Sequence, residues 1–403
     1  MKSILISSFD MEIGGVERSL IGLLESFDYG RYDVDLMLYR HRGEFMSLLP
    51  KKPNLLPEIS EYASFRKPVP EVLKDGHLGI ALSRMAAKYI GQMEAACKGY
   101  RERGLIPMQL GWKYALPMLP QLQKKYDIAI SFLWPHYFVS EKVKAEKKIA
   151  WVHTDYSYLE IDNKLDAKMW DGFDFIVAVS ESCRASFLRR YPQFEKRTAV
   201  IENILSPDFI RKMSGEDVSG EITGDDQHVK LVTVARLAFP KGIDDAVRAC
   251  RILLDDGYKL KWYVVGYGSE ESSIRDLISK LGLKENFILL GKKINPYPYV
   301  KACDIYVQPS RYEGKAVTVT EAQILGKPVV ITNYATAASQ VRDGFDGIIT
   351  GQGVEGIVRG IKKMVDNPDM RKKLMKNTMS SDYGNSREIE KLYRLIENQE
   401  VPA

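Results

Sequence analysis

Short hydrophobic runs alternate with amphipathic segments along the chain, in two successive series. Residues 2–9 (KSILISSF) are typical of a buried strand, residues 12–27 contain a glycine turn and an amphipathic pattern, and residues 32–39 form a second hydrophobic run. This order of strand, glycine loop, helix and strand predicts a parallel, doubly wound sheet. Further strands are predicted at 127–133, 148–153 and 173–180, with mostly helical structure over 60–125.

A polar, glycine-containing stretch at 206–228 separates the two series and is typical of an interdomain linker. A second strand–helix series then begins with VKLVTVARL. A chain of 403 residues is long enough for two domains. We therefore predict an α/β protein with domains at 1–205 and 229–385, and a C-terminal helix at about 386–403 that packs back on the first domain.

The charged residues are distributed unevenly along the chain. Residues 51–150 carry 17 Lys and Arg against 9 Asp and Glu, whereas the whole chain has a net charge of only +5. Such a basic block indicates an anionic partner, either a membrane surface or a charged substrate, or else an ordinary solvated face. The candidate acceptor or membrane contacts in it, which lie among apolar residues, are Arg84, Lys88, Arg101, Arg103, Trp112 and Lys113.

Several classes of protein are disfavoured. The four cysteines are scattered without a CxxC pair, which argues against a disulfide framework or a cysteine metal site and fits a reducing compartment. The first hydrophobic run is too short for a signal peptide, and no run approaches the ~18 apolar residues of a transmembrane helix. We expect a cytoplasmic protein, or one held peripherally at the inner face of the cell membrane, and no nucleic-acid partner.

Ligands of parallel α/β sheets bind at the carboxyl ends of the strands, which selects the candidate residues of the second domain. Arg236 ends a strand and Lys241 begins a helix, an arrangement that suits a phosphate or diphosphate, although two surface cations would look the same. Gly266 follows the next strand and would let a ligand approach the backbone. A planar base could lie against the strand that ends at Gly291.

The first domain offers weaker signals. Gly14 and Gly15 follow the first strand without the G-x-G-x-x-G spacing of a dinucleotide site, which disfavours an NAD-linked oxidoreductase, but they provide amide groups at a helix start. His153 lies at a strand end beside Thr154 and Asp155, where structural and functional roles are equally compatible with the sequence.

The segment RYEGKAVTVTEA carries two glutamates eight residues apart. Glu313 lies in a loop after a strand and Glu321 lies within the following helix, so the carboxylates could accept hydrogen bonds from a sugar and from a ribose. Backbone amides between them could hold a phosphate, which matches the layout of a nucleotide sugar. The residues of this central stretch are Gly314, Lys315, Ala316 and Val317. The alternative to a ligand site is that both glutamates are ordinary side chains on a helix surface.

Together, EGKAVTVTEA, RLAFPKG, VVGYGSE and GGVER resemble the retaining glycosyltransferases of family 4, and the resemblance covers nearly the whole chain. It implies the GT-B fold, two Rossmann-like domains with the active site in the cleft between them, and a role in bacterial capsule, exopolysaccharide or other surface glycans. In this family the second domain holds the nucleotide sugar and the first holds the acceptor, which is often a lipid-linked diphosphate sugar.

The resemblance also implies roles for individual residues. Arg236 and Lys241 would bind the donor diphosphate and stabilise the leaving group, Glu313 would contact the donor sugar, and Glu321 the ribose. Gly15 would lie near the diphosphate and His153 near the reacting centre. No metal or other cofactor is implied, and the departing phosphate itself would take the acceptor proton. The only D-x-D pair, Asp33 and Asp35, lies within a predicted strand and has a structural interpretation.

This chain departs from the family pattern at two places. Lys315–Ala316 stands where Phe-Gly is common, and Glu202–Asn203–Ile204 stands where Pro-Asn-Gly is common. The leading hypothesis is a retaining, metal-independent transfer of a hexose from a nucleoside-diphosphate sugar to a glycan or lipid-linked acceptor. A UDP-sugar is favoured by frequency alone. The alternative is a catalytically silent GT-B protein that binds nucleotide or glycan as a scaffold.

Overall fold

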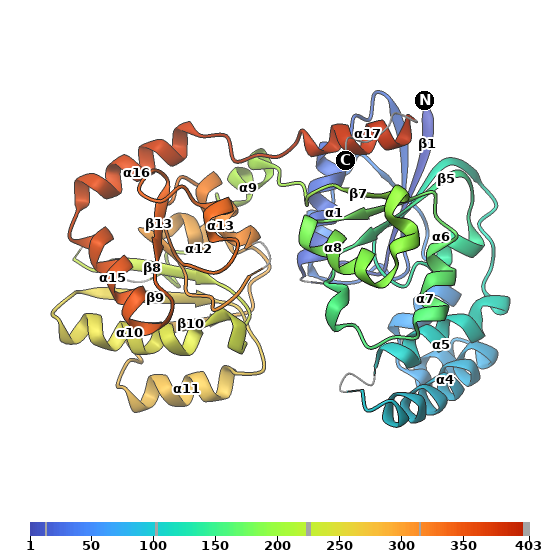
Figure 1. Ribbon diagram of the computed structural model, residues 1–403, viewed down its shortest axis with the longest axis horizontal. Coiled ribbons are helices and arrows are strands. Elements are labelled where there is room, and N and C mark those ends of the chain that lie inside the picture. Colours follow the sequence, from blue (N-terminus) through green and yellow to red (C-terminus); the bar gives the residue numbers. More distant parts are fainter. Residues whose placement is uncertain (13, 101–103, 223–226, 314–315, 398–403) are drawn as a thin grey trace. The chain divides into compact units, whose positions relative to one another are not determined.

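The computed structural model describes residues 1–12, 14–100, 104–222, 227–313 and 316–397, and the chain forms two compact units. Unit 1 contains Met1–Leu205 and the chain from Asn385 onward, and unit 2 contains Ser206–Gly384. In each unit helices cover both faces of a sheet (Figure 1). This arrangement is expected for parallel strands, because each crossover connection lays a helix on one face.

Unit 1 is built on a parallel sheet of seven strands in the order β3-β2-β1-β4-β5-β6-β7. Its strands are β1 Lys2–Ser8, β2 Tyr32–Leu38, β3 Asn54–Leu55, β4 Lys125–Ser131, β5 Lys144–Val152, β6 Phe175–Ala178 and β7 Thr198–Val200. Its helices are α1 Gly15–Ser26, α2 Ser60–Ala63, α3 Val69–Lys74, α4 Leu78–Cys97, α5 Leu105–Ala115, α6 Tyr137–Lys142, α7 Asn163–Trp170, α8 Glu181–Arg190 and α17 Glu388–Ile396.

Unit 2 repeats the architecture with six parallel strands in the order β10-β9-β8-β11-β12-β13. Its strands are β8 Val229–Val234, β9 Leu260–Val265, β10 Phe287–Gly291, β11 Ile305–Gln308, β12 Val329–Thr332 and β13 Gly347–Thr350. Its helices are α9 Pro207–Met213, α10 Ile243–Asp255, α11 Glu271–Lys280, α12 Tyr297–Ala302, α13 Val317–Ile324, α14 Ala337–Gln340, α15 Gly353–Val365 and α16 Pro368–Ser380.

The hydrophobic runs of the sequence become strands that are buried on both faces. In β8, Leu231 belongs to the core on one face of the sheet and Val232 to the core on the other. Trp262 and Tyr263 in β9 divide in the same way. Successive side chains of a strand point to opposite faces, so a strand covered on both sides must be apolar throughout.

In each sheet, the side on which successive strands are added changes once along the chain. In unit 1 it runs from β1 outward to β3 and then returns to place β4 on the other side of β1. In unit 2 the same reversal lies between β8 and β11. Loops at the carboxyl ends of the strands diverge at such a switch point, which leaves room for a ligand.

The segment predicted as a linker, 206–228, is instead packed into unit 2 where the structure describes it. Helix α9 lies against α12 and α13, and Ile210 is 1% exposed. Asn295 donates to the carbonyl of Met213 at 2.7 Å, and Ile222 belongs to a core cluster. The polar composition of this segment did not reveal that it packs on unit 2. A few apolar side chains at suitable positions are enough to anchor a connecting segment.

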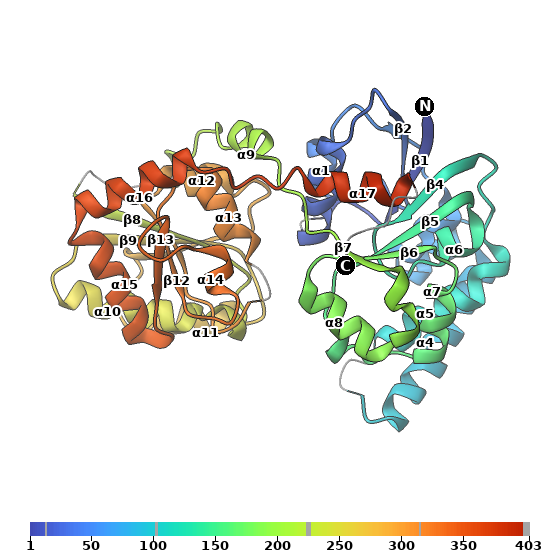
Figure 2. The same ribbon diagram turned by 45° about the horizontal axis from the view of Figure 1, so that its top comes forward.

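Helix α17 belongs to unit 1 although it comes last in the chain. Tyr393 stacks on Tyr32 with ring centroids 5.0 Å apart, and its hydroxyl accepts from the amide of Asp28 at 2.7 Å. Leu395 and Ile396 are buried. Figure 2 shows α17 beside α1. The chain therefore enters unit 1, passes through all of unit 2, and returns to unit 1.

Candidate functional site

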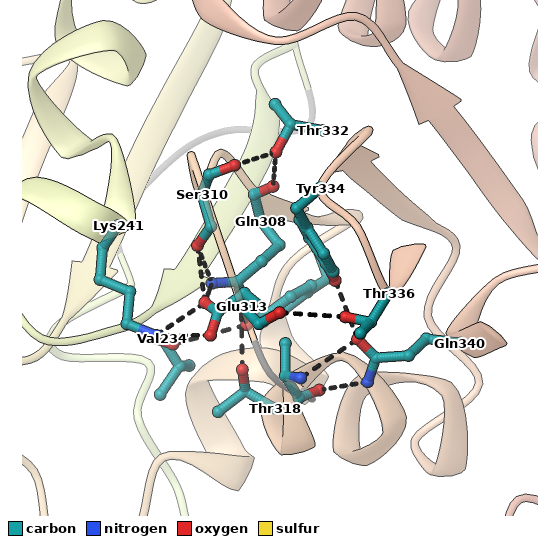
Figure 3. A network of polar contacts seen from close by, with 12 residues as sticks. Val234, Lys241, Gln308, Ser310, Glu313, Thr318, Thr332, Tyr334, Thr336 and Gln340 are labelled. Atoms are coloured by element: carbon teal, nitrogen blue, oxygen red, sulfur yellow. Dashed lines mark hydrogen bonds and ion pairs between the residues drawn. The ribbon is translucent and has the colours of Figure 1, made fainter. Parts of the chain in front are cut away.

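Glu313 is the centre of a polar network at the switch point of unit 2 (Figure 3). Lys241 Nζ lies 2.7 Å from both of its carboxylate oxygens, and the two side chains are only 20% and 8% exposed. Ser310 Oγ donates to Glu313 Oε1 at 2.7 Å, and Gln308 Nε2 donates to the same oxygen at 3.1 Å. This partly buried carboxylate is therefore fixed in position and charge-compensated by one cation.

A close backbone approach brings Lys241 to the network. Lys241 ends a short 3₁₀ turn, Phe239–Lys241, after β8, and Gly242 follows with φ +63°. A Cβ at Gly242 would lie 2.2 Å from the carbonyl oxygen of Pro309, which follows β11. Only glycine fits a left-handed conformation at such a contact. Gly242 thus lets the loops after β8 and β11 meet, and this is how a lysine and a glutamate 72 residues apart form an ion pair.

Arg311 also connects the loops after β8 and β11. It donates to the carbonyl of Phe239 at 2.7 Å and pairs with Asp244 and Asp245 in the first turn of α10 at 2.9 and 2.7 Å. Its guanidinium also lies 4.4 Å from the centroid of the Phe239 ring. These contacts fix the turn that carries Lys241, so the role of Arg311 is to position Lys241 beside Glu313.

A further layer of neutral groups holds the network. Tyr306 donates to Gln308 Oε1 at 2.6 Å, which turns the amide nitrogen of Gln308 toward Glu313. Gln340 accepts from the amide of Ala316 at 3.1 Å and donates to its carbonyl at 3.1 Å. The amide of Ala316, a predicted anion contact, is therefore already satisfied by a side chain in this structure.

Arg236 is placed differently from Lys241. Its side chain is exposed, and within the described part of the chain no hydrogen bond or ion pair engages its guanidinium. Gly266, after β9, has φ +150°, and a Cβ there would lie 1.9 Å from the carbonyl oxygen of Ala235. Gly266 thus has a packing role, because it allows the loop after β9 to lie against the loop that presents Arg236. Its amide donates to the carbonyl of Gly291 at 2.9 Å.

Glu321 lies inside unit 2, not on a helix surface, so the surface alternative is wrong for this residue. It is 2% exposed, in helix α13, and it accepts from the hydroxyl of Tyr297 at 2.9 Å. Val317 begins that helix. Glu313 and Glu321 therefore lie at different levels of one unit, the first at its polar network and the second behind it in the interior.

The candidates of unit 1 are distributed around its own switch point. Gly14 and Gly15 lie at the start of α1, which follows β1, and a Cβ at Gly15 would have open space around it. His153 follows β5, and burial lowers the pKa of its imidazole to about 4. Its Nε2 atom is buried without a hydrogen-bond partner in the described structure. At neutral pH this histidine is uncharged, which argues against a role as a phosphate-binding cation.

Two predicted acceptor or membrane contacts are wrong because their side chains serve the fold of unit 1. Trp112 is 1% exposed and stacks on Phe65 with ring centroids 3.9 Å apart. Arg84 is partly buried and donates to the carbonyls of Ser64 and Lys67. Lys88 and Lys113 are exposed as predicted. Four further candidates lie outside the described residues, namely Arg101, Arg103, Gly314 and Lys315.

The D-x-D pair has the structural role predicted for it. Asp35 is 3% exposed and accepts from Lys124, Tyr126 and Asn54. Asp33 forms a longer ion pair with Lys124, at 3.6 Å. Over the residues that the structure describes, no three His, Cys, Asp or Glu side chains gather as metal ligands would, and none of the helices is both long and apolar enough to cross a bilayer.

Residues 219–380, nearly all of unit 2, match the family model for glycosyl transferases group 1. Unit 2 therefore resembles a group 1 glycosyltransferase domain. The chain is 25% identical over 170 residues to the uncharacterized glycosyltransferase MJ1059 of Methanocaldococcus jannaschii, a match that covers 42% of each protein. It is 29% identical over 147 residues to the capsular polysaccharide biosynthesis glycosyltransferase CapM of Staphylococcus aureus, covering 36% of this chain and 38% of CapM. The chain thus spans less than half of either relative.

The GT-B fold of the whole chain is supported by solved structures. The crystal structure of HepE from Anabaena in complex with UDP and glucose superposes with a TM-score of 0.68 at 16% identity, and the match covers 99% of this chain and all of HepE. At this identity the likeness establishes the architecture of the chain and no more. It agrees with the two parallel-sheet units described above.

Several residues of the candidate site in unit 2 escaped the sequence prediction. Gln308, Ser310 and Arg311 lie in the stretch DIYVQPSRYEG, whose resemblance to the family was noted without roles for these side chains. Gly242 ends the motif RLAFPKG but had no role assigned to it, and Gln340 gave no local signal. Arg311 and Gln340 act through contacts across 72 and 24 positions of the chain, which no local pattern encodes.

Proposed function

We propose that the protein is a retaining glycosyltransferase that moves a hexose from a UDP-sugar to a glycan or lipid-linked acceptor in surface-polysaccharide biosynthesis. The observation that carries the proposal is the Lys241–Glu313 ion pair, held by Ser310 and Gln308 at the switch point of a domain that matches the group 1 model. Unit 2 would bind the donor and unit 1 the acceptor. The capsular role of CapM and the UDP in the HepE crystal support the polysaccharide and the nucleotide.

In this proposal the exposed Arg236 and the fixed Lys241 bind the donor diphosphate. Lys241 has three N–H donors, and contacts to the two oxygens of Glu313 leave one of them for a phosphate oxygen. Positive charge held rigidly beside the leaving group stabilises the negative charge that develops as the glycosidic bond breaks. Glu313 keeps Lys241 in place and offers its carboxylate to the donor sugar, and Glu321 recognises the ribose.

Acceptor attack would follow on the same face of the sugar from which the diphosphate leaves. The acceptor hydroxyl donates its proton to the departing phosphate oxygen, so the protein supplies neither a nucleophile nor a metal ion. The enzyme's part is then to position the donor and to stabilise charge.

Release of nucleoside diphosphate from a panel of nucleotide sugars tests the activity. We expect turnover of UDP-sugars, and a loss of about 100-fold or more for Arg236→Ala. A catalytically silent scaffold would bind UDP without turning over any donor. If no donor is turned over, and Arg236→Ala and Glu321→Ala also leave UDP affinity unchanged, the site assignment is wrong.

Peripheral contact with an anionic membrane is part of the proposal, through helix α4, which lies within the predicted basic block and carries the predicted contact Lys88. Helix α4 presents an apolar outward face opposite its packed residues Ile80, Ala87 and Gly91. Its members are exposed by 44–69%: Leu78, Leu82, Met85, Tyr89 and Met93. An outward face of this kind is unusual for a helix in water. The exposed Lys88 and the surrounding basic block would add attraction to anionic lipid.

Flotation with vesicles of phosphatidylglycerol and phosphatidylcholine tests this contact. We expect Leu82→Glu and Tyr89→Glu to abolish vesicle binding, because each places a carboxylate in the apolar face. Ile252→Glu, at a residue of α10 in unit 2 that is 39% exposed, is the matched control and should bind as the wild type does. Unchanged binding by both α4 variants would contradict the assignment.

A further inference from the structure

Tyr297 connects two helices of unit 2 through its hydroxyl group. It is the first residue of α12, it is buried, and its hydroxyl donates to Glu321 Oε1 of α13 at 2.9 Å. The two residues are 24 positions apart, and their helices pack against each other. Tyr297 thereby fixes one oxygen of the second carboxylate of the glutamate pair.

Helix α9 anchors Tyr297. The ring of Phe209 meets the ring of Tyr297 edge to face, with centroids 6.4 Å apart. The buried Asn295 joins the two segments: its Nδ2 donates to the carbonyl of Met213 at 2.7 Å, and its Oδ1 accepts from the amide of Tyr297 at 3.2 Å. Because both the ring and the backbone of Tyr297 are held, its hydroxyl has one fixed position.

Burial limits the way in which Glu321 could meet a ligand. The residue is 2% exposed, so it can present no more than one edge of its carboxylate to a bound molecule. A hydrogen bond is strong only within a narrow range of distances and angles. The neighbours that set the orientation of this carboxylate therefore decide whether the presented edge meets a ligand hydroxyl in that range.

We propose that Tyr297 is a positioning residue for nucleotide recognition, which orients Glu321 to accept a hydrogen bond from a ribose hydroxyl of the donor. Tyr297 itself touches no part of the nucleotide. The inference rests on the proposed function for the ribose contact of Glu321 and adds the group that makes this contact selective. A site that holds its acceptor rigidly rejects an analogue without the hydroxyl, because the buried acceptor then loses that partner.

A purely structural role of Tyr297 predicts a different result. If the hydroxyl only stabilises the packing of α12 on α13, its loss weakens every ligand of unit 2 alike. In a positioning role, its loss weakens the ligands that carry the ribose hydroxyl and spares a ligand that has no ribose. The preference between matched ligands therefore distinguishes the two roles.

Calorimetric titration of the full chain with UDP, 2′-deoxy-UDP, 3′-deoxy-UDP and pyrophosphate tests the proposal. We expect the wild type to bind UDP at least about tenfold more tightly than the weaker of the two deoxy analogues, the scale of one hydrogen bond to a charged group. In Tyr297→Phe this preference should fall below about threefold, whereas the affinity for pyrophosphate should stay within about twofold of that of the wild type.

Tyr299→Phe is the matched control. Tyr299 is buried in the same helix, and its hydroxyl donates to a different glutamate, Glu221, at 2.6 Å. This variant should keep the wild-type preference for UDP. Glu321→Ala should lose the preference as Tyr297→Phe does, and the double variant should lose no more than Glu321→Ala alone, because both changes act on one contact. A Tyr297→Phe protein that keeps the full preference, or a Tyr299→Phe protein that loses it, overturns the proposal.

Failure of the proposed function gives a different pattern. If UDP affinity responds to Lys241→Met but the wild type does not distinguish the deoxy analogues, only the roles given to Glu321 and Tyr297 fail. Equal weakening of UDP and pyrophosphate in Tyr297→Phe would show a structural role and would also overturn the positioning proposal alone. If the wild type binds neither UDP nor pyrophosphate, unit 2 holds no donor site, and both proposals fail.

Discussion

The two units share a topology but place opposite chemistry at the carboxyl ends of their strands. In unit 2 the loops after β8 and β11 bring together a lysine, a glutamate and several neutral donors. In unit 1 the loops after β4 and β5 enclose a cavity lined mainly by indole, leucine and isoleucine side chains. Backbone topology thus determines where the loops converge, whereas the loop side chains determine whether they form a charged network or an apolar cavity.

Removing the cation from unit 2 should have the largest effect. Lys241→Met leaves Glu313, with 8% of its side chain exposed, without a positive partner and removes a phosphate contact. We expect donor turnover to fall by about 100- to 1000-fold, or ~3–4 kcal/mol. Steady-state release of UDP measures the effect. Lys280→Ala, at an exposed residue of α11, is the control. A loss of less than fivefold would show that the polar network is structural.

The close approach that builds the polar site can be tested without changing a charge. In Gly242→Ala the new Cβ meets the carbonyl oxygen of Pro309 and the backbone stays left-handed, so we expect a loss of about 3 kcal/mol in the free energy of unfolding and a parallel loss of UDP affinity. Gly257→Ala is a matched control, because Gly257 also has a positive φ, +88°, but open space around a Cβ. It should cost about 1 kcal/mol and leave UDP affinity unchanged. Equal costs would mean that the contact with Pro309 is easily relieved.

The apolar cavity of unit 1 depends on one buried carboxylate behind it. Asp166 is 0% exposed and accepts from Trp134, Trp170 and Tyr191 at 2.8, 3.0 and 2.8 Å, and its burial raises its pKa. Asp166→Asn turns an amide group toward these donors, so at least one of them loses its acceptor. We expect a loss of about 2–3 kcal/mol in the stability of unit 1.

Tryptophan fluorescence during denaturant unfolding measures this loss, because four of the five tryptophans, all except Trp262, lie in unit 1. The exposed Asp171→Asn is the control and should change the stability by less than about 0.5 kcal/mol. If Asp166→Asn is as stable as the wild type, the three hydrogen bonds do not hold the cavity wall.

Acid should weaken unit 1 through its buried histidines. His136 is 0% exposed, and burial and the neighbouring His153 lower its pKa to about 3. Protonation of the unfolded chain below pH 6.5 therefore competes with folding, and the stability falls as the pH falls from 6.5 toward 3. For His136 alone the loss between pH 7 and pH 5 is about 2 kcal/mol. Denaturant midpoints at the two pH values measure it.

His136→Phe should remove the part of the stability loss between pH 7 and pH 5 that is due to His136. His41→Asn, at an exposed residue, should lose as much stability as the wild type does. A pH dependence that is unchanged in His136→Phe would assign the effect to other groups. Unit 2 provides the internal comparison, since both histidines whose pKa is lowered by burial, His136 and His153, lie in unit 1.

Much of the architecture was predictable because it depends on local pattern. Runs buried on both faces identified the strands of both sheets, and strand-end positions selected Lys241, Glu313 and His153. The same reasoning misassigned Trp112 and Arg84, because an aromatic or basic residue in a helix gives no sign of whether it faces a membrane or the core. It placed a possible membrane contact in the basic block but did not identify the outward face of α4, which becomes visible only when its opposite face is seen packed.

The sequence by itself determined the class of this protein: two parallel α/β units and a motif-rich second half typical of group 1 glycosyltransferases. Only the tertiary structure decided which candidate groups meet. Lys241 and Glu313 are 72 positions apart and touch because Gly242 allows two loops to approach. The cavity at His153 likewise depends on walls from separate loops and on Asp166 behind Trp134. Local hydrophobicity encodes strands and helices, but the distance between two loop side chains depends on the packing of the whole unit.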